Sequence, residues 1–245
     1  MPNLYFYAGS TNPELYELQN KLIDPERKIE KVMEEFCDFE SSVIVDVGAG
    51  SGFHSHMYAS TASMVYAVEP DSGMLKQLIS RQARDFRSNF CVVKGFAEDL
   101  PFKSDLADIV HARLAYFFGP PMKYTESCEE GIEEVKRVLK TDGYFFNIQN
   151  NYSSGQYAGF LELSYGRDLK GLQKEISDYF VSRGFLERVV RTKWRANNRG
   201  EIEKALTLEF PIEKVGQIMK AFSGNEFSHD FSIFVFRKRI SGENG

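Results

Sequence analysis

A short apolar run followed by alternating glycines lies at residues 43–52, with the sequence VIVDVGAGSG. Val43 to Val47 are apolar and β-branched apart from the acid at Asp46, which predicts a buried parallel strand. Gly48, Gly50 and Gly52 predict a tight turn, and helical character resumes at residues 53–59. A strand, a glycine turn and a helix in this order bring bare backbone against a ligand at a helix N-terminus. Residues 43–52 therefore predict a ligand-binding turn.

Two acids flank this turn at positions that suit a particular ligand. Asp46 lies at the end of the first strand, and Glu69 ends a second apolar run, residues 64–68. Glu69 follows Gly52 by about seventeen residues, near the spacing at which an acid meets the ribose in dinucleotide-binding folds. Asp46 favours an ammonium group, whereas the amides and dipole of the helix favour a carboxylate. An amino-acid moiety carries both charges, so we expect a ligand that combines a ribose with an amino acid.

Composition limits the class of protein. The chain has 245 residues with 42% hydrophobic and 27% charged residues, which is typical of one globular α/β domain. The net charge of -5 argues against a dedicated nucleic-acid binder. Three scattered cysteines, with neither a disulfide framework nor a zinc spacing, predict a reducing compartment and no metal site. With neither a secretory signal nor an apolar run of membrane-spanning length, we expect a cytoplasmic protein without a membrane partner.

Alternating strands and helices predict a doubly wound α/β sheet with right-handed crossovers. Two helices are expected before the first strand, from Pro13 and from Pro25, as a cap over the ligand or an outer layer of the sheet. Residues 231–236 are apolar on both faces of the last strand, which places that strand inside the sheet. The expected strands are 43–47, 64–68, 90–93, 106–112, 144–148, 186–196 and 230–237, and the later helices are 72–79, 127–139, 172–181, 201–208 and 211–222.

Several motifs, in order, resemble those of the class I S-adenosylmethionine-dependent methyltransferases. Residues 46–52 resemble their first motif, Glu69-Pro70 the acid that ends their second strand, and residues 95–102, GFAEDLPF, the adenine-side loop of the small-molecule, type 11-like branch. Residues 105–110 and 138–144 resemble their fourth strand and the turn into the fifth. The resemblance implies a mostly parallel, seven-stranded sheet with the last strand antiparallel and helices on both faces, and S-adenosyl-L-methionine as the cofactor.

The resemblance also implies a set of cofactor-binding residues. Glu69 would accept from the ribose hydroxyls, and Asp46 with the glycine turn would hold the amino-acid end. Phe96 departs from the family pattern, which often has an acid there for the adenine amino group, so Glu98 or the backbone of Ala97 must serve, or Phe96 stacks on the ring. The set comprises Asp46, Gly48, Ala49, Gly50, Gly52, Glu69, Pro70, Ala97, Glu98 and His111.

Catalytic candidates follow the fourth strand, at the expected crevice between the first and fourth strands. His111 is a candidate general base, Arg113 a candidate partner for a carboxylate, and Tyr116 a candidate for positioning the acceptor. The alternative is that His111 is internally hydrogen-bonded and Tyr116 is pocket wall. Two further groups of residues are expected to border the crevice. The polar group comprises Asn147, Gln149, Asn150, Asn151 and Tyr152. The aromatic group comprises Tyr5, Phe6, Tyr7 and Tyr16, which form either a lid over the ligand or ordinary packing.

The sequence thus predicts a methyltransferase acting on a small-molecule acceptor. We expect one domain over residues 1–245, with a helical cap (1–38), a cofactor-binding core (39–150) and a substrate region that completes the sheet (151–245). One alternative is an RNA methyltransferase that uses the basic face of Arg191, Lys193 and Arg195, although the charged, exposed face of an edge strand is the favoured explanation of these residues. A dinucleotide-dependent oxidoreductase and a non-catalytic S-adenosylmethionine-binding protein are the others. The acceptor and the oligomeric state are not assigned.

Overall fold

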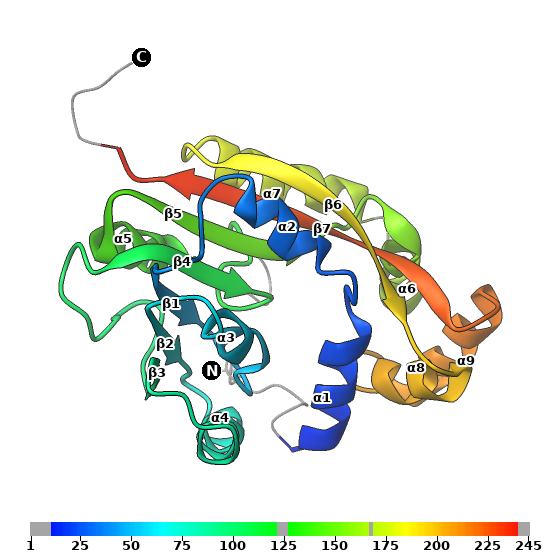
Figure 1. Ribbon diagram of the computed structural model, residues 1–245. Helices are drawn as coiled ribbons and strands as arrows, with labels where there is room; N and C mark the ends of the chain where they lie inside the picture. The colour runs from blue at the N-terminus through cyan, green and yellow to red at the C-terminus, as the bar shows by residue number, and fades with distance from the viewer. Residues whose placement is uncertain (1–10, 122–126, 167–168, 240–245) are drawn as a thin grey trace.

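The computed structural model describes residues 11–121, 127–166 and 169–239 (Figure 1). Its centre is a seven-stranded sheet in the order β3-β2-β1-β4-β5-β7-β6. The proposed lid residues Tyr5, Phe6 and Tyr7 lie outside the described residues. The strands are β1 (Val43–Val47), β2 (Met64–Val68), β3 (Phe90–Val93), β4 (Ala107–Arg113), β5 (Leu139–Asn150), β6 (Leu186–Arg195) and β7 (Glu226–Arg237).

The strand directions confirm the predicted doubly wound fold. Strands β1 to β5 pair in parallel, whereas β7 pairs antiparallel with both β5 and β6. β7 therefore lies inside the sheet, as its two apolar faces predicted, and residues 229–235 are all buried. The strand order reverses between β1 and β4, which is where doubly wound folds bind ligands.

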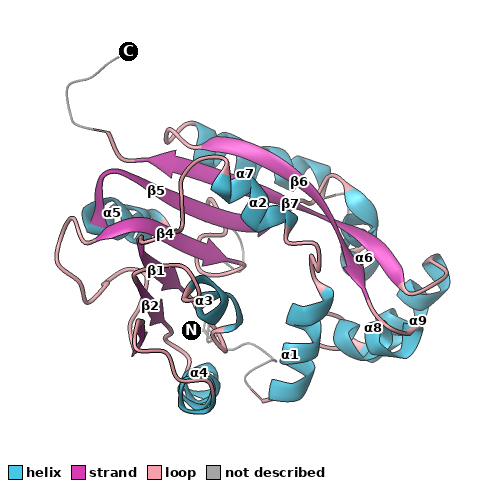
Figure 2. Cartoon of the chain, in the orientation of Figure 1, coloured by secondary structure: helices cyan, strands magenta, loops and turns pink. Residues whose placement is uncertain are grey.

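Helices cover both faces of the sheet (Figure 2). On one face, α5 and α7 pack against the sheet through Ile132, Val135, Ile176 and Phe180. On the other, α2, α3 and α4 bury residues such as Ile29, Met33, Tyr58 and Leu78. The helices are α1 (Pro13–Leu22), α2 (Lys28–Glu34), α3 (Phe53–Tyr58), α4 (Ser72–Arg84), α5 (Glu129–Val138), α6 (Gly155–Tyr165), α7 (Lys170–Val181), α8 (Arg199–Leu206) and α9 (Ile212–Ala221).

A third apolar cluster forms where β6 and β7 extend beyond the rest of the sheet (Figure 1). Trp194 and Phe227 lie at its centre, and α6, α8 and α9 surround them. Leu22 of α1 belongs to the same cluster, which attaches the N-terminal helix to the C-terminal part of the chain. Helix α6 was not among the predicted elements. None of the described helices is long and apolar enough to cross a membrane.

The two N-terminal helices occupy different places in the fold. Helix α2 covers the sheet, whereas residues of α1 line the cavity described below. The prediction that the second helix begins at Pro25 was wrong, because α2 begins at Lys28. Asp24 and Arg27 both have positive φ, and the Asp24 carboxylate accepts from the amide of Ile29 at 2.8 Å. The left-handed backbone at Arg27 cannot continue a right-handed helix, so α2 begins after it, and the Asp24 carboxylate satisfies an amide of its first turn.

Candidate functional site

A cavity of about 450 Å³ opens at the carboxyl ends of β1 and β4, where the strand order reverses. Its wall includes residues of α1, the glycine turn and the loops that follow β2, β3 and β4. Of the residues predicted to bind the cofactor or to take part in catalysis, Gly52 is the one that does not line it. The predicted residues that do are Asp46, Gly48, Ala49, Gly50, Glu69, Pro70, Ala97, Glu98, His111, Arg113 and Tyr116.

The three glycines of the turn have different neighbours, and all three have positive φ. A Cβ on Gly48 would lie 2.4 Å from the Cβ of Ala115, and one on Gly52 would lie 2.3 Å from Cδ1 of Leu78 in α4. A Cβ on Gly50 would lie 2.6 Å from the hydroxyl of Tyr16. The turn is thus enclosed by the loop after β4, by α4 and by α1, which explains why no larger residue suits these positions.

Replacing Gly48 with alanine is expected to destabilise the protein by about 1–2 kcal/mol or more. The backbone of Gly48 is left-handed, which is unfavourable for alanine, and the added Cβ would also clash with the Cβ of Ala115. Gly216 in α9 is the matched control, since it is exposed and nothing lies within 4 Å of an added Cβ. There, alanine should stabilise the protein by up to about 1 kcal/mol. Chemical denaturation of both variants measures this, and equal stabilities would contradict the proposed strain at the turn.

Glu69 connects the end of β2 to the glycine turn. One carboxylate oxygen accepts from the amide of Gly50 at 2.7 Å and the other from the amide of Asp71 at 2.8 Å. Burial raises the pKa of Glu69 to about 7, despite these two donors, and the charges of Asp71 and Asp46 add to the rise. Asp71 itself caps α4 by accepting from the amides of Gly73 and Met74. Glu69 is therefore held rigidly in the cavity wall, with lone pairs left for further donors.

Asp46 has two internal partners. Its carboxylate accepts from His111 Nδ1 at 2.8 Å and from the hydroxyl of Ser55. The Nε2 atom of His111 lies 3.1 Å from the hydroxyl of Tyr58. Burial opposes ionisation of Asp46, but His111 and Ser55 outweigh it and lower its pKa. Both ring nitrogens of His111 are engaged, which favours a positioning role for His111 over that of a general base.

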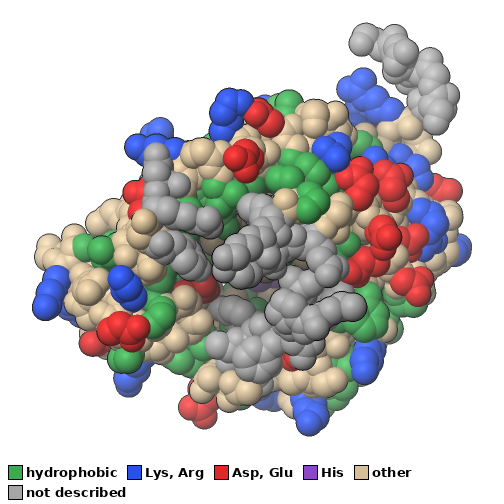
Figure 3. Space-filling view, turned by 180° about the vertical axis from the view of Figure 1, so that it is seen from behind, with side chains coloured by type: hydrophobic (Ala, Val, Ile, Leu, Met, Phe, Trp, Pro, Cys, Tyr) green, Lys and Arg blue, Asp and Glu red, His purple; other side chains and the backbone are tan. Residues whose placement is uncertain are grey.

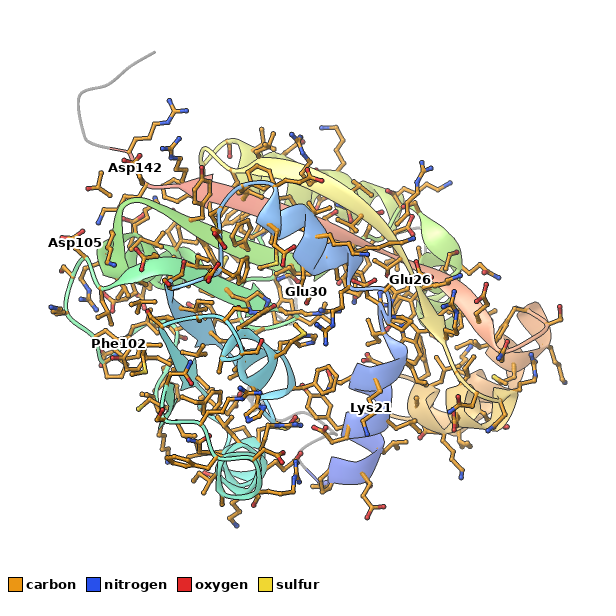
Figure 4. All side chains as sticks on the ribbon, viewed as in Figure 1. Lys21, Glu26, Glu30, Phe102, Asp105 and Asp142 are labelled. Atoms are coloured by element: carbon orange, nitrogen blue, oxygen red, sulfur yellow. The ribbon has the colours of Figure 1, made fainter. Side chains whose placement is uncertain are left out.

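A buried ion pair continues this network toward α2. Arg113 Nη1 lies 3.3 Å from Glu30 Oε1, and His54 Nδ1 lies 3.6 Å from the same oxygen. Glu30 lies below α2 in Figure 4, between that helix and α3. Burial opposes ionisation of Glu30, yet His54 and Arg113 lower its pKa to about 2, while burial and Arg113 lower that of His54 to about 4. Glu30 and Tyr58 were not predicted as site residues, because an acid or a tyrosine in an amphipathic helix carries no local signal.

Three of the polar residues expected after the fifth strand, Asn147, Gln149 and Asn150, lie within β5 itself, and most of the group forms hydrogen bonds inside the protein. The amides of Asn147 and Gln149 both donate to the carbonyl of Phe117, at 3.0 and 2.8 Å. Asn151 donates to Ser232 Oγ. Of the five polar residues proposed for this rim, Asn150 is the one that lines the cavity. Asn147 and Gln149 hold the loop after β4, and with it Tyr116, in position.

Phe96 and the two residues after it lie at the adenine-side loop. Ala97 and Glu98 line the cavity, whereas Phe96 is 43% exposed and is not among the lining residues. The loop closes through the amide of Asp99, which donates to the carbonyl of Phe96 at 3.3 Å. The stacking role considered for Phe96 thus requires its ring to turn inward.

Helix α1 closes the cavity on the side opposite β4. Tyr16 lies over Gly50, and burial raises the pKa of its phenol to about 12, so it stays neutral. Glu17 accepts from Ser51 Oγ at 2.6 Å and forms an ion pair with Arg81 of α4. These contacts fasten α1 to the glycine turn and to α4, so the N-terminal helix forms part of the cavity wall.

Comparisons with known proteins agree with this geometry. Residues 45–147 match the family model described as a methyltransferase domain. An uncharacterized chloroplastic methyltransferase of Arabidopsis thaliana is 32% identical over 127 residues, which cover 49% of this chain and 34% of that protein. The chloroplastic 2-methyl-6-phytyl-1,4-hydroquinone methyltransferase of Spinacia oleracea is 31% identical over 106 residues, 41% of this chain and 27% of that protein. The chain thus spans about a third of the length of these relatives.

Solved structures share the fold. The crystal structure of the YcgJ protein of Bacillus subtilis has a TM-score of 0.59 and 17% sequence identity, and the match covers 88% of this chain and all of that one. Sheet order and cavity define a Rossmann-like protein with its ligand site at the switch point. Residues 45–147 are thus similar to a methyltransferase domain, which agrees with the resemblance to the class I S-adenosylmethionine-dependent methyltransferases drawn from the motifs.

Proposed function

We propose that this protein binds S-adenosyl-L-methionine in the cavity at the ends of β1 and β4 and transfers its methyl group to a small-molecule acceptor. The observation that carries the proposal is Glu69, a buried carboxylate fixed in the cavity wall by two backbone amides. A carboxylate in this position accepts from both hydroxyls of a ribose, and the glycine turn beside it leaves room for the rest of the ligand.

The remaining roles follow from the positions of the side chains. The Ala97–Glu98 loop borders the adenine end, and Asp46 borders the amino-acid end through the carboxylate lone pairs that His111 and Ser55 leave free. The sulfonium of the bound cofactor supplies an activated methyl group. The protein's task is then to align the acceptor with it, and alignment accounts for about 7–11 kcal/mol of a barrier. The acceptor would enter the part of the cavity lined by His54, Arg113 and Asn150.

Surface charge weighs against an RNA acceptor. Lys193 and Arg195 of the edge strand β6 are both paired with Glu26 and Glu226, at 2.8–3.7 Å. These acids neutralise the face on which phosphates would lie. Seen from behind, the molecule shows acidic side chains gathered near α5, with lysines and arginines between them (Figure 3). The cytoplasmic location inferred from the sequence stays a prediction.

A binding assay followed by a turnover assay tests this function. We expect S-adenosylhomocysteine to raise the melting temperature of the protein and NAD to leave it unchanged. With S-adenosylmethionine and a pool of small metabolites, we then expect the protein to release S-adenosylhomocysteine. Stabilisation by NAD alone would favour an oxidoreductase, and cofactor binding without turnover would favour the non-catalytic alternative.

Cofactor affinity should depend on pH through Glu69. Its pKa of about 7 lies above the usual value, so the carboxylate is mostly protonated at pH 6 and mostly ionised at pH 8. Only the ionised form accepts from two hydroxyls, so the affinity for S-adenosylhomocysteine should rise up to about tenfold from pH 6 to pH 8. Calorimetry measures this. Glu69→Gln is the control because it removes the titration, and an equal pH dependence in that variant would exclude Glu69 as its source.

A further inference from the structure

Two hydrogen-bonded chains of side chains approach the same part of the cavity wall. Arg113 of β4 is the register partner of Ile148 of β5, and Asn150 lies two residues further along, hence on the same face of the sheet. Phe231 of β7 is the register partner of Asn150, and the Arg113 guanidinium lies 5.4 Å from the centre of its ring. Arg113 and Asn150 are therefore near neighbours in the wall of one cavity.

The first chain fixes the orientation of Asn150. Trp194 Nε1, which can only donate, lies 2.7 Å from His229 Nδ1, so this nitrogen must accept. His229 is stacked between Tyr157 and Phe231, and burial lowers its pKa well below the usual value. The neutral ring thus carries its proton on Nε2, which lies 2.9 Å from Asn150 Oδ1. The Asn150 carbonyl is occupied, which leaves its amide NH₂ as the group to face a ligand.

The second chain holds Arg113. Its hydrogen bonds to the described residues all run through Nη1, which contacts Glu30 and His54. Glu30 in turn lies 3.5 Å from the Tyr58 hydroxyl, which connects this chain to His111 and Asp46. Nε and Nη2 of Arg113 make no hydrogen bond to the described part of the chain. A guanidinium edge and an amide NH₂ therefore border the acceptor side of the cavity together.

We propose that Arg113 and Asn150 bind a carboxylate of the methyl acceptor, an inference that rests on the proposed function. Both groups offer donors, and a guanidinium edge matches the two oxygens of a carboxylate. A neutral amide of the same shape would place its own NH₂ against one of these donors. Glu30, Trp194 and His229 act as positioning residues. The site thus selects acceptors that carry a carboxylate over their amides and esters.

Binding of two isosteric probes tests this inference. In the presence of saturating S-adenosylhomocysteine, ligand-observed NMR titration should give a dissociation constant for propionate at least tenfold below that for propionamide. Asn150→Asp keeps the size of the side chain and the acceptor for His229 but adds a negative charge, and it should abolish this preference. Asn197→Asp, which adds the same charge at an exposed position, should preserve it.

Two further variants separate an effect on the positions of Asn150 and Arg113 from an effect on the stability of the protein. Trp194→Phe removes the donor to His229 and keeps a ring in the cluster, so the propionate preference should fall even where the melting temperature also falls. A purely structural role would leave the preference unchanged in the folded protein. The double variant Glu30→Gln with Arg113→Gln removes the buried pair without leaving one charge behind, and it should lose propionate binding.

The outcomes are distinguishable from those that test the function. Equal binding of propionate and propionamide, or an unchanged preference in Asn150→Asp, overturns the carboxylate site while S-adenosylhomocysteine binding still stands. Failure of wild-type protein to bind S-adenosylhomocysteine overturns the proposed function, and this inference with it.

Discussion

Glu30→Ala is expected to lower the free energy of unfolding by about 3–5 kcal/mol, because it leaves the Arg113 guanidinium buried without its counter-ion. The side chains of Arg113 and Glu30 are only 7% and 10% exposed, so water from the cavity replaces the lost partner only in part. Denaturant titration measures the effect. Glu34→Ala is the matched control, since Glu34 is an exposed acid on the same helix. Similar stabilities of the two variants would contradict the importance of the pair.

The Arg113–Glu30 pair also predicts that the free energy of unfolding depends on pH. The pKa of Glu30 is lowered to about 2 in the folded protein, below its value in the unfolded chain. Its contribution is therefore complete above the unfolded pKa of about 4.5 and is lost as the pH falls toward 2. Wild type should lose stability over this interval, and the difference between wild type and Glu30→Ala should narrow as the pH falls.

Glu69→Ala is expected to weaken the binding of S-adenosylmethionine at least tenfold. The variant removes a carboxylate that would accept from two ribose hydroxyls, and each charge-assisted bond of this kind contributes about 1.5–3 kcal/mol. A tenfold loss of affinity corresponds to about 1.4 kcal/mol, which is less than the energy given above for two such hydrogen bonds, so tenfold is a lower bound on the expected loss. Isothermal titration calorimetry with S-adenosylmethionine and S-adenosylhomocysteine measures it.

Two controls are needed to separate an effect of Glu69→Ala on cofactor binding from an effect on the structure of the turn. Glu69 also accepts from the amides of Gly50 and Asp71, so the alanine variant loosens the turn itself. Glu69→Gln keeps the size and one acceptor oxygen, and its affinity should fall between those of wild type and Glu69→Ala. Glu40→Ala removes an exposed acid outside the cavity and should bind as wild type does. Unchanged affinity in Glu69→Ala would remove Glu69 from the ribose site.

Local patterns predicted the sheet well. The bounds of β1, β2 and β3 are those expected from their apolar runs, and α4 begins at Ser72 as expected. Where the prediction differed, distant contacts explain it. Thr141 to Gly143 was expected to be a turn before a strand at Tyr144, but β5 already begins at Leu139. Lys140 pairs there with Asp108, and the Asp142 amide donates to the carbonyl of Lys238. Neighbouring strands thus hold an irregularity inside β5, where the register with β4 shifts and Asp142 has positive φ.

The fold class, the position of the cavity and the acid expected at the ribose could be predicted from the sequence, because they depend on short spacings within consecutive elements. Which polar side chains form hydrogen bonds inside the protein became clear only from the folded structure. Glu30 meets Arg113 across 83 positions of sequence and His229 meets Asn150 across 79. Such pairs depend on strand register and helix packing, and no local pattern encodes either. The acceptor side of the cavity is built from these pairs, so its chemistry emerges only in the folded chain.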